Sequence, residues 1–223
     1  LKLKGLKFSI ILELEQGNPL KLMPSNIFDG YLALDPSAEA TNQIFIFPRP
    51  LEGEPLKSNR ARDVPWIGSF GFGTPGKGFE LLVEAANREF EKAVVRINIP
   101  RGNYTSGMNG VHGQEYSRYL GAICERIAKP GIEVRFTFDF MSPPQLLNWC
   151  SDNDLNCFLY TRRQPGLSAT TDQAILSGRP LITGSNDTFR HIHQYIPPYP
   201  IIGLRDAIDI TAPQVHKMQK DWS

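Results

Sequence analysis

Residues 156–192 read NCFLYTRRQPGLSATTDQAILSGRPLITGSNDTFRHI, and this stretch decides the fold that we expect. It opens with an apolar run at 157–160, short enough for a strand buried on both faces. After a polar loop, Ser168 and Asp172 mark a helix start, because a hydroxyl can cap the first turn and an acid favours it. Gly178 ends this helix, and residues 180–183 give the next buried strand. In such a strand–helix–strand unit, anions bind where the loop meets the helix.

The same alternation of strand and helix continues on both sides of this stretch. From Trp66 onward, the predicted strands cover residues 66–72, 93–100, 132–140, 157–160, 180–183 and 200–202. Helices are predicted from residues 79, 116, 142, 168 and 204, with a short one at 186–193 and a long loop at 101–113. This order predicts an α/β fold, a Rossmann-like doubly wound parallel sheet with right-handed crossovers.

The first quarter of the chain is less regular. Residues 7–12 and 44–47 read as strands, and a third short strand is expected within 28–37. The polar stretch 51–63 reads as a linker. We therefore expect a partial N-terminal segment with its linker at 1–63 and a ligand-binding domain at 64–223.

Composition excludes several classes of protein. Of 223 residues, 41% are hydrophobic and 21% are charged, which is typical of a globular protein, and the net charge of +1 gives no basic field for nucleic acid. No apolar run approaches the ~20 residues of a membrane helix. Three cysteines stand at no metal-ligand spacing, so we expect reduced core residues and a cytoplasmic protein. Peripheral membrane contact is left open.

Two loops at predicted strand ends could hold an anion. Residues 73–78 are rich in glycine and include Lys77, in a spacing that fits neither a dinucleotide fingerprint nor a P-loop. The loop offers backbone room and one cation, or else its glycines only permit a turn and Lys77 is solvated. The helix start at 167–172 could hold phosphate, or its hydroxyls could simply cap the helix. Both pairs of alternatives remain open at this stage.

Two other motifs have a functional and a structural interpretation. Asp139 and Phe140 end a predicted strand, where they could contact a base or a ribose, or where Phe140 could belong to the core. His191 and His193 form a His-x-His pair, but no other ligands accompany them and their side chains would point apart on a helix. We predict no metal site.

Two blocks of the sequence resemble a known family. Residues 66–70 (WIGSF) with 77–85 (KGFELLVEA), and later residues 173–182 (QAILSGRPLI), are similar to segments of the C-terminal domain of GT-B glycosyltransferases. The similarity covers roughly residues 64–205. It implies an enzyme that moves a sugar from a nucleotide-diphosphate sugar to a glycan or other acceptor, as in polysaccharide biosynthesis. The donor is its substrate, and no cofactor is implied.

The resemblance also implies which residues bind the donor. By position, Lys77 would contact the diphosphate, the segment from Leu167 to Thr170 would hold phosphate, and Gln173 would meet the ribose. Asp139 and Phe140 would lie near the base. No residue is assigned a catalytic role. The full predicted donor-binding set is Ser69, Gly71, Lys77, Asp139, Phe140, Arg162, Arg163, Leu167, Ser168, Ala169, Thr170, Gln173 and Arg190.

The sequence departs from the family pattern at three points. Ser69 stands where the family has an arginine, and Gln173 where it has a glutamate. Residues 1–63 are too short for a full N-terminal domain and look like its last strands and a linker. We hypothesise that Arg162, Arg163 or Arg190 replaces the missing arginine. The alternative functions are a non-catalytic nucleotide-binding or protein-interaction domain of GT-B ancestry, and an unrelated flavodoxin-like binding module.

Overall fold

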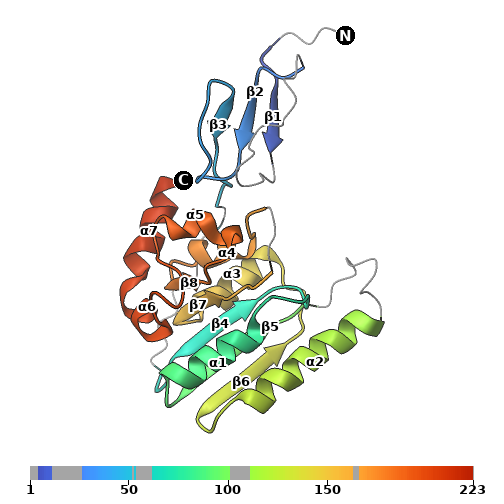
Figure 1. Cartoon of the computed structure of the whole chain (residues 1–223), viewed down its shortest axis with the longest axis vertical. Helices are drawn as coiled ribbons and strands as arrows, with labels where there is room; N and C mark the ends of the chain where they lie inside the picture. The colour runs from blue at the N-terminus through green and yellow to red at the C-terminus, as the bar shows by residue number, and fades with distance from the viewer. Residues whose placement is uncertain are drawn as a thin grey trace.

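The computed structural model describes residues 5–11, 27–51, 53, 62–100, 111–162 and 166–222. It contains two parallel sheets, one with the strand order β1-β2-β3 and one with the order β6-β5-β4-β7-β8. In Figure 1 the small sheet stands above the larger α/β body, and the chain passes from one to the other after β3. The predicted parallel α/β fold is therefore confirmed.

The strands are β1 (Phe8–Ile11), β2 (Gly30–Ala33), β3 (Ile44–Ile46), β4 (Trp66–Phe70), β5 (Ala93–Asn98), β6 (Ile132–Thr137), β7 (Leu155–Phe158) and β8 (Leu181–Thr183). The helices are α1 (Phe79–Glu89), α2 (Val111–Ile127), α3 (Pro143–Ser151), α4 (Thr170–Leu176), α5 (Arg190–His193), α6 (Leu204–Ile210) and α7 (Ala212–Asp221). A short 3-10 helix, η1 (Asp187–Phe189), precedes α5.

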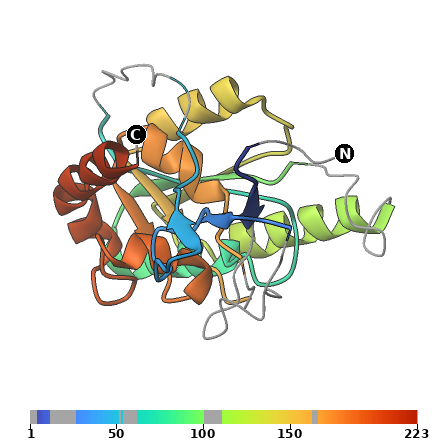
Figure 2. The ribbon, with the colours of Figure 1, turned by 90° about the horizontal axis from the view of Figure 1, so that it is seen from above.

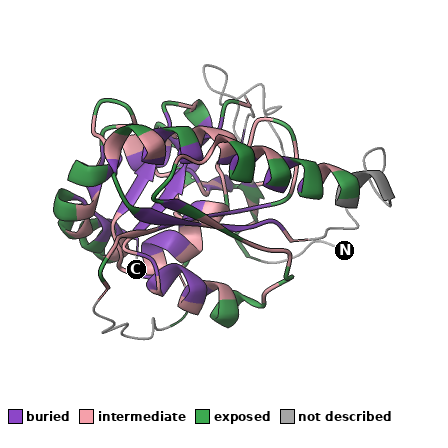
Figure 3. Cartoon of the chain, turned by 90° about the horizontal axis from the view of Figure 1, so that it is seen from below, coloured by how far each residue is buried: buried purple, intermediate pink, exposed green. Residues whose placement is uncertain are grey.

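The five-stranded sheet is buried on both faces by two separate apolar clusters. One cluster packs α1, α2 and α6 against one face, with Ile67 and Cys157 pointing into it. The other packs α3, α4 and α7 against the opposite face, with Phe70 and Phe158 pointing into it. Neighbouring residues of a strand thus enter different cores, as strand geometry requires. Figure 3 shows the buried sheet between its two helical layers.

The predicted core role of the three cysteines is confirmed. Cys124, Cys150 and Cys157 are buried and unpaired by disulfides. Burial raises the pKa of Cys124 to about 12, and it also raises the pKa values of Cys150 and Cys157. These thiols are therefore protonated and act as small apolar side chains.

The three-stranded sheet, seen end-on from above in Figure 2, has one buried and one exposed apolar face. Tyr31 and Ile44 belong to a small buried cluster on the first face. On the second face, the rings of Phe8 and Phe45 meet edge to face with centroids 5.7 Å apart. They close over Gly30, where a Cβ atom would come within 2.8 Å of each ring.

Three expectations about the elements were wrong. The single helix expected from residue 204 is two helices, α6 and α7, because Pro213 cannot donate a backbone hydrogen bond to continue the first one. The predicted strand at 200–202 is a turn, and only an isolated bridge joins Gly184 to Tyr199. The prolines of this segment have no N–H to donate, so a sheet ladder cannot continue there. The loop predicted to reach residue 113 ends earlier, because α2 begins at Val111. Residues 101–110, and most of the predicted linker at 51–63, lie outside the described residues.

The turn before α1 leads to a prediction about Gly78. Gly78 has a φ of 69°, and an added Cβ atom would overlap the carbonyl oxygen of Leu159. We expect Gly78→Ala to lower the free energy of unfolding by about 2 kcal/mol, measured by urea denaturation. Gly121→Ala is the matched control, because a Cβ atom there, inside α2, would come no closer than 3.8 Å to Phe136. This control should stabilise by up to about 1 kcal/mol, and equal effects of the two changes would contradict the account.

Candidate functional site

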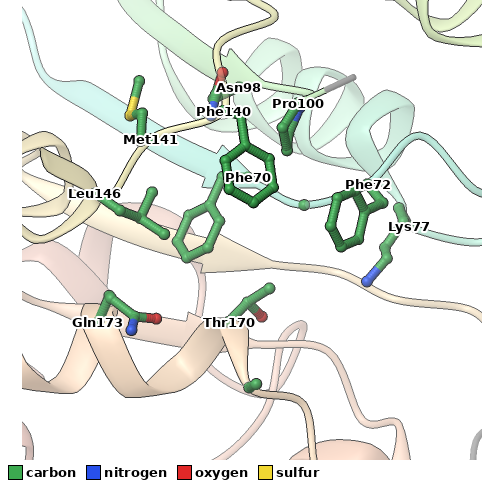
Figure 4. A pocket seen from close by; sticks show the side chains of 12 residues that line it. Phe70, Phe72, Lys77, Asn98, Pro100, Phe140, Met141, Leu146, Thr170 and Gln173 are labelled. Carbon is green, nitrogen blue, oxygen red and sulfur yellow. The ribbon is translucent and has the colours of Figure 1, made fainter. Parts of the chain in front are cut away.

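A pocket of about 240 Å³ opens at the carboxyl ends of β4 and β5. This is where ligands bind in open parallel sheets. Figure 4 shows the pocket between the two strand ends, the loop before α3, and α4. It is lined by Phe70, Gly71, Phe72, Lys77, Asn98, Pro100, Phe140, Met141, Leu146, Ala169, Thr170 and Gln173.

The two ends of this pocket differ in chemistry. Met141 and Leu146 form an apolar end, and Lys77 stands at the opposite end (Figure 4). Phe140 lies between them, with 68% of its surface exposed. Among the described residues that line the pocket, Lys77 alone carries a charge. The pocket therefore suits a ligand with a planar or apolar part and an anionic part.

Lys77 is held in place without a carboxylate partner. Its Nζ lies 4.1 Å from the centroid of the Tyr160 ring, a cation–π contact. No acid of the described residues forms an ion pair with it. The positive charge of Lys77 is thus available to an anionic ligand.

The loop that carries Lys77 is tied to the end of β7. The amides of Thr161 and Arg162 donate to the carbonyl oxygen of Gly76 over 3.0 and 3.3 Å. Gly76 and Gly78 have φ values of 77° and 69°, which other residues rarely adopt. The glycines therefore have a conformational role, and the turn that they form presents Lys77 to the pocket.

The start of α4 forms the opposite wall through a hydroxyl network. The Thr170 hydroxyl lies 3.0 Å from the Tyr160 hydroxyl and 2.8 Å from that of Ser168. The expected cap by Ser168 is wrong: Ala169 occupies the N-cap, and no side chain caps the helix. Ser168 binds the Thr170 side chain instead. The predicted helix end is confirmed, since Gly178 has a φ of 67° just after α4.

A second polar group, Asn98, was missed by the sequence reasoning. Its side chain is only 2% exposed, donates to the carbonyl oxygen of Asp139 and accepts from the Thr137 hydroxyl. It thereby fixes the turn that presents Phe140. Asn98 ends β5, so the strand-end rule that singled out Asp139 could also have found it.

The structure brings together six of the predicted donor-binding residues: Gly71, Lys77, Phe140, Ala169, Thr170 and Gln173. The others lie elsewhere. Ser69 is buried within β4, Ser168 stands behind Thr170, and Leu167 lines a separate small cavity with Asp172 and His191. The side chain of Asp139 is exposed, and only its carbonyl oxygen is held near the pocket.

The three arginines proposed as replacements differ in position. The Nη1 of Arg162 donates to the Thr74 hydroxyl over 3.3 Å, beside the Lys77 loop. Arg190 lies outside the pocket, because its guanidinium pairs with Asp35 at 2.6 Å. Arg163 falls outside the described residues. Arg162 is thus the candidate that stands near Lys77.

Both histidines of the His-x-His pair contact other groups of the protein. His191 is buried, and its Nε2 lies 3.0 Å from the Thr171 hydroxyl. Burial, together with the charge of Arg49, lowers the pKa of His191 well below its ordinary value, so this imidazole is neutral. His193 Nε2 lies 3.0 Å from the carbonyl oxygen of Gly184. Within the described part of the chain, no group of three His, Cys, Asp or Glu is placed to hold a metal ion.

Comparison with solved structures shows which fold this is. Sucrose-phosphate synthase from Thermosynechococcus elongatus matches 86% of this chain and 51% of its own, with a TM-score of 0.57 and 17% identity. A TarM variant from S. aureus, in complex with UDP, matches 95% and 44%, with a TM-score of 0.52 and 16% identity. HepE from Anabaena, in complex with UDP and glucose, matches 72% and 44%, with a TM-score of 0.51 and 16% identity.

These structures are GT-B glycosyltransferases, so the fold predicted from the sequence blocks around Lys77 and Gln173 is confirmed. The chain spans about half the length of the structures that it matches. No protein-family model matches the sequence, and a search of curated proteins gives no significant match. No helix of the described residues is long and apolar enough to cross a membrane.

Asp172, on the outer side of α4, gives a prediction about pH. Its carboxylate pairs with Arg49 at 2.9 Å, yet burial raises its pKa from 3.8 to about 6. Because the folded pKa lies above the unfolded one, this group stabilises the fold at low pH. That contribution is lost as pH rises from about 4 to 6.

Replacing Asp172 by Asn removes this titration. The free energy of unfolding of Asp172→Asn, measured relative to the unaltered chain, should therefore rise between pH 4 and pH 7 by up to about 3 kcal/mol. Urea denaturation at several pH values tests this. Parallel pH profiles for the two proteins would show that Asp172 does not titrate in this range.

Proposed function

We propose that this chain binds a nucleotide-diphosphate sugar and forms the donor-binding half of a glycosyltransferase. The single observation that carries the proposal is Lys77, a cation without an acidic partner among the described residues, at one end of a pocket whose other end is apolar. A nucleotide-diphosphate sugar has the matching parts, an anionic diphosphate and a planar base. The complexes of HepE and TarM with UDP support the proposal.

Each end of the pocket would then have a distinct task. Lys77 would neutralise the diphosphate as it leaves the sugar, a form of electrostatic catalysis that needs no bound metal when the cations suffice. Phe140 and Met141 would cover the base. The side-chain amide of Gln173 can both donate and accept, so it suits the hydroxyls of the ribose.

Arg162 would supply a second cation for the diphosphate. Its backbone amide is bound to Gly76, one residue before Lys77. Its guanidinium makes one long hydrogen bond, to Thr74, and no ion pair within the described residues. A guanidinium held this weakly can turn toward a diphosphate, which offers it stronger charge-assisted bonds. Arg162 would thus take the role of the family's arginine, whose position Ser69 occupies in this chain.

The wider role of the enzyme is part of the proposal. We propose that the acceptor is a glycan or another hydroxyl compound, that the reaction serves polysaccharide biosynthesis, and that it takes place in the cytoplasm. Three buried free cysteines support a reducing compartment.

Calorimetric titration with UDP, GDP, ADP and CMP, with and without Mg²⁺, tests the donor site. We expect one diphosphate to bind with a micromolar dissociation constant that does not depend on Mg²⁺. Lys77→Ala should weaken this binding by about 10- to 100-fold, because it removes a charge-assisted contact. Lys92→Ala, at an exposed lysine after α1, is the matched control and should bind normally. A folded chain that binds none of these nucleotides would contradict the proposal.

The role of Arg162 is tested with the same nucleotide. Arg162→Ala should weaken binding of the diphosphate by about 10-fold but leave binding of the corresponding nucleoside unchanged, because the guanidinium meets only phosphate. Arg126→Ala, at an exposed position in the last turn of α2, controls for the loss of a surface charge. If Arg162→Ala and Arg126→Ala bind alike, Arg162 is not the second cation.

A further inference from the structure

Two reciprocal ion pairs join the N-terminal segment (residues 27–51) to the larger domain. Arg49, after β3, pairs with Asp172 of α4 at 2.9 Å. Arg190 of α5 pairs with Asp35, after β2, at 2.6 Å. Each side of the junction thus provides one arginine and one aspartate. The two pairs differ in the helix that they contact. Only the pair of Arg49 and Asp172 involves α4, the helix that lines the pocket.

Arg49 binds the start of α4 at two points. Its Nη2 donates to the carbonyl oxygen of Ser168 over 3.1 Å and to the Asp172 carboxylate over 2.9 Å. These two acceptors lie on either side of residues 169–171, the turn in which α4 begins. The side chains of Arg49 and Asp172 are only 24% and 21% exposed, so the contact is largely shielded from water. One guanidinium therefore bridges the first turn of the helix.

This turn depends on contacts from outside the helix. α4 has seven residues, and Ala169 at its N-cap offers no side-chain acceptor. A helix this short is unstable by itself, because few backbone bonds offset the cost of forming the first turn. The bridge from Arg49 instead ties this turn to the N-terminal segment through two acceptors, the carbonyl oxygen of Ser168 and the Asp172 carboxylate. The Thr171 hydroxyl adds a second bond to the carbonyl oxygen of Ser168 over 2.8 Å.

The held turn is also a wall of the pocket. Ala169 and Thr170 line the pocket directly, and the Thr170 hydroxyl contacts that of Tyr160. The ring of Tyr160 in turn carries Lys77 on its face at 4.1 Å. A continuous set of contacts thus leads from Arg49, which does not line the pocket, to the cation that does.

We infer that Arg49 is a positioning residue of the donor pocket, through which the N-terminal segment sets the affinity for the nucleotide. The identity of the ligand in this inference rests on the proposed function. The effect of Arg49 on the start of α4 does not. When Arg49 is removed, the start of α4 should loosen and the contacts around Thr170 and Lys77 should be lost for part of the time. Affinity for the diphosphate then falls, although no group that touches it has changed.

The test uses the whole chain and measures two quantities, the stability of the α4 hydrogen bonds and the affinity of the pocket for nucleotides. Amide hydrogen exchange over residues 168–176 reports on α4 without any ligand, and calorimetry with UDP, GDP, ADP and CMP reports on the pocket. The variants are Arg49→Gln, Arg49→Lys and, as the matched control, Asp35→Asn. The control breaks the other ion pair of the same junction and leaves the bridge to α4 intact.

We expect exchange over residues 168–176 to become at least 10-fold faster in Arg49→Gln, with a dissociation constant about 10-fold higher. Arg49→Lys should recover part of both effects, because its ammonium can still reach Asp172. Asp35→Asn should leave both close to the unaltered chain. A merely structural role of the junction would instead make Arg49→Gln and Asp35→Asn equivalent, and that result would overturn the inference, as would unchanged exchange in Arg49→Gln.

Failure of the proposed function gives a different result. If the unaltered chain binds none of the four nucleotides, the donor proposal fails. Exchange over residues 168–176 in the free protein still decides whether Arg49 positions the start of α4.

Discussion

The carbonyl oxygen of Gly76 accepts hydrogen bonds from two amides of the loop after β7, and the candidate site depends on this contact. It ties the loop before α1 to the loop before α4, which lies far along the chain. As a result, Lys77 rests on the Tyr160 ring, and the Tyr160 hydroxyl meets Thr170. A cation from one strand–helix unit is thereby brought to face a hydroxyl network from another. Only glycine is suited to this turn, because Gly76 and Gly78 both have positive φ.

One of the two apolar cores, on the side of the sheet that α3, α4 and α7 cover, supports this arrangement. Phe158 and Phe189 are fully buried. Phe158 packs against Phe70 of the pocket with ring centroids 5.3 Å apart, and Tyr160 packs against Phe189 with centroids 4.8 Å apart. The ring that supports Lys77 is thus fixed by the same cluster that anchors α4 and α7. The floor of the pocket belongs to the core, whereas the exposed Phe140 at its opening does not. The polar groups of the site are therefore positioned by the apolar core on which they pack.

Most of the fold could be predicted from the sequence, because apolar periodicity and turn residues are local signals. They predict a strand at 157–160, which overlaps β7, as well as the end of α4 at Gly178 and the Lys77 loop. One error about the site concerns a partner that is distant in sequence. Arg190 follows a polar turn and looks available for an anion, but it pairs with Asp35, which stands 155 residues away. Ser168 looks like a cap, but its hydroxyl contacts that of Thr170, and α4 begins after it with Ala169 as the N-cap.

The site was only partly predictable. Lys77 and Thr170 were found because they stand in a loop after a predicted strand and at a predicted helix start, whereas Gln173 was assigned by the resemblance to GT-B glycosyltransferases. Leu146 and Met141 were missed, since an apolar residue that lines a pocket has the same sequence pattern as one in the core. Arg49 was missed because its partner Asp172 in α4 stands 123 residues away in the sequence.

A crystal structure of the chain with its best-binding nucleoside diphosphate tests the central claim most directly. A second group of cations surrounds Trp66 at the amino end of β4, with the guanidiniums of Arg62, Arg96 and Arg135 at 4.0, 5.0 and 4.9 Å from its ring centroid. Arg62 and Arg135 already pair with Asp154 and Glu133. We predict that the diphosphate lies within hydrogen-bonding distance of Lys77 Nζ and that the base covers Phe140 and Met141. A nucleotide bound at Trp66, or with its base at Lys77 and its phosphates at Met141, would contradict the account.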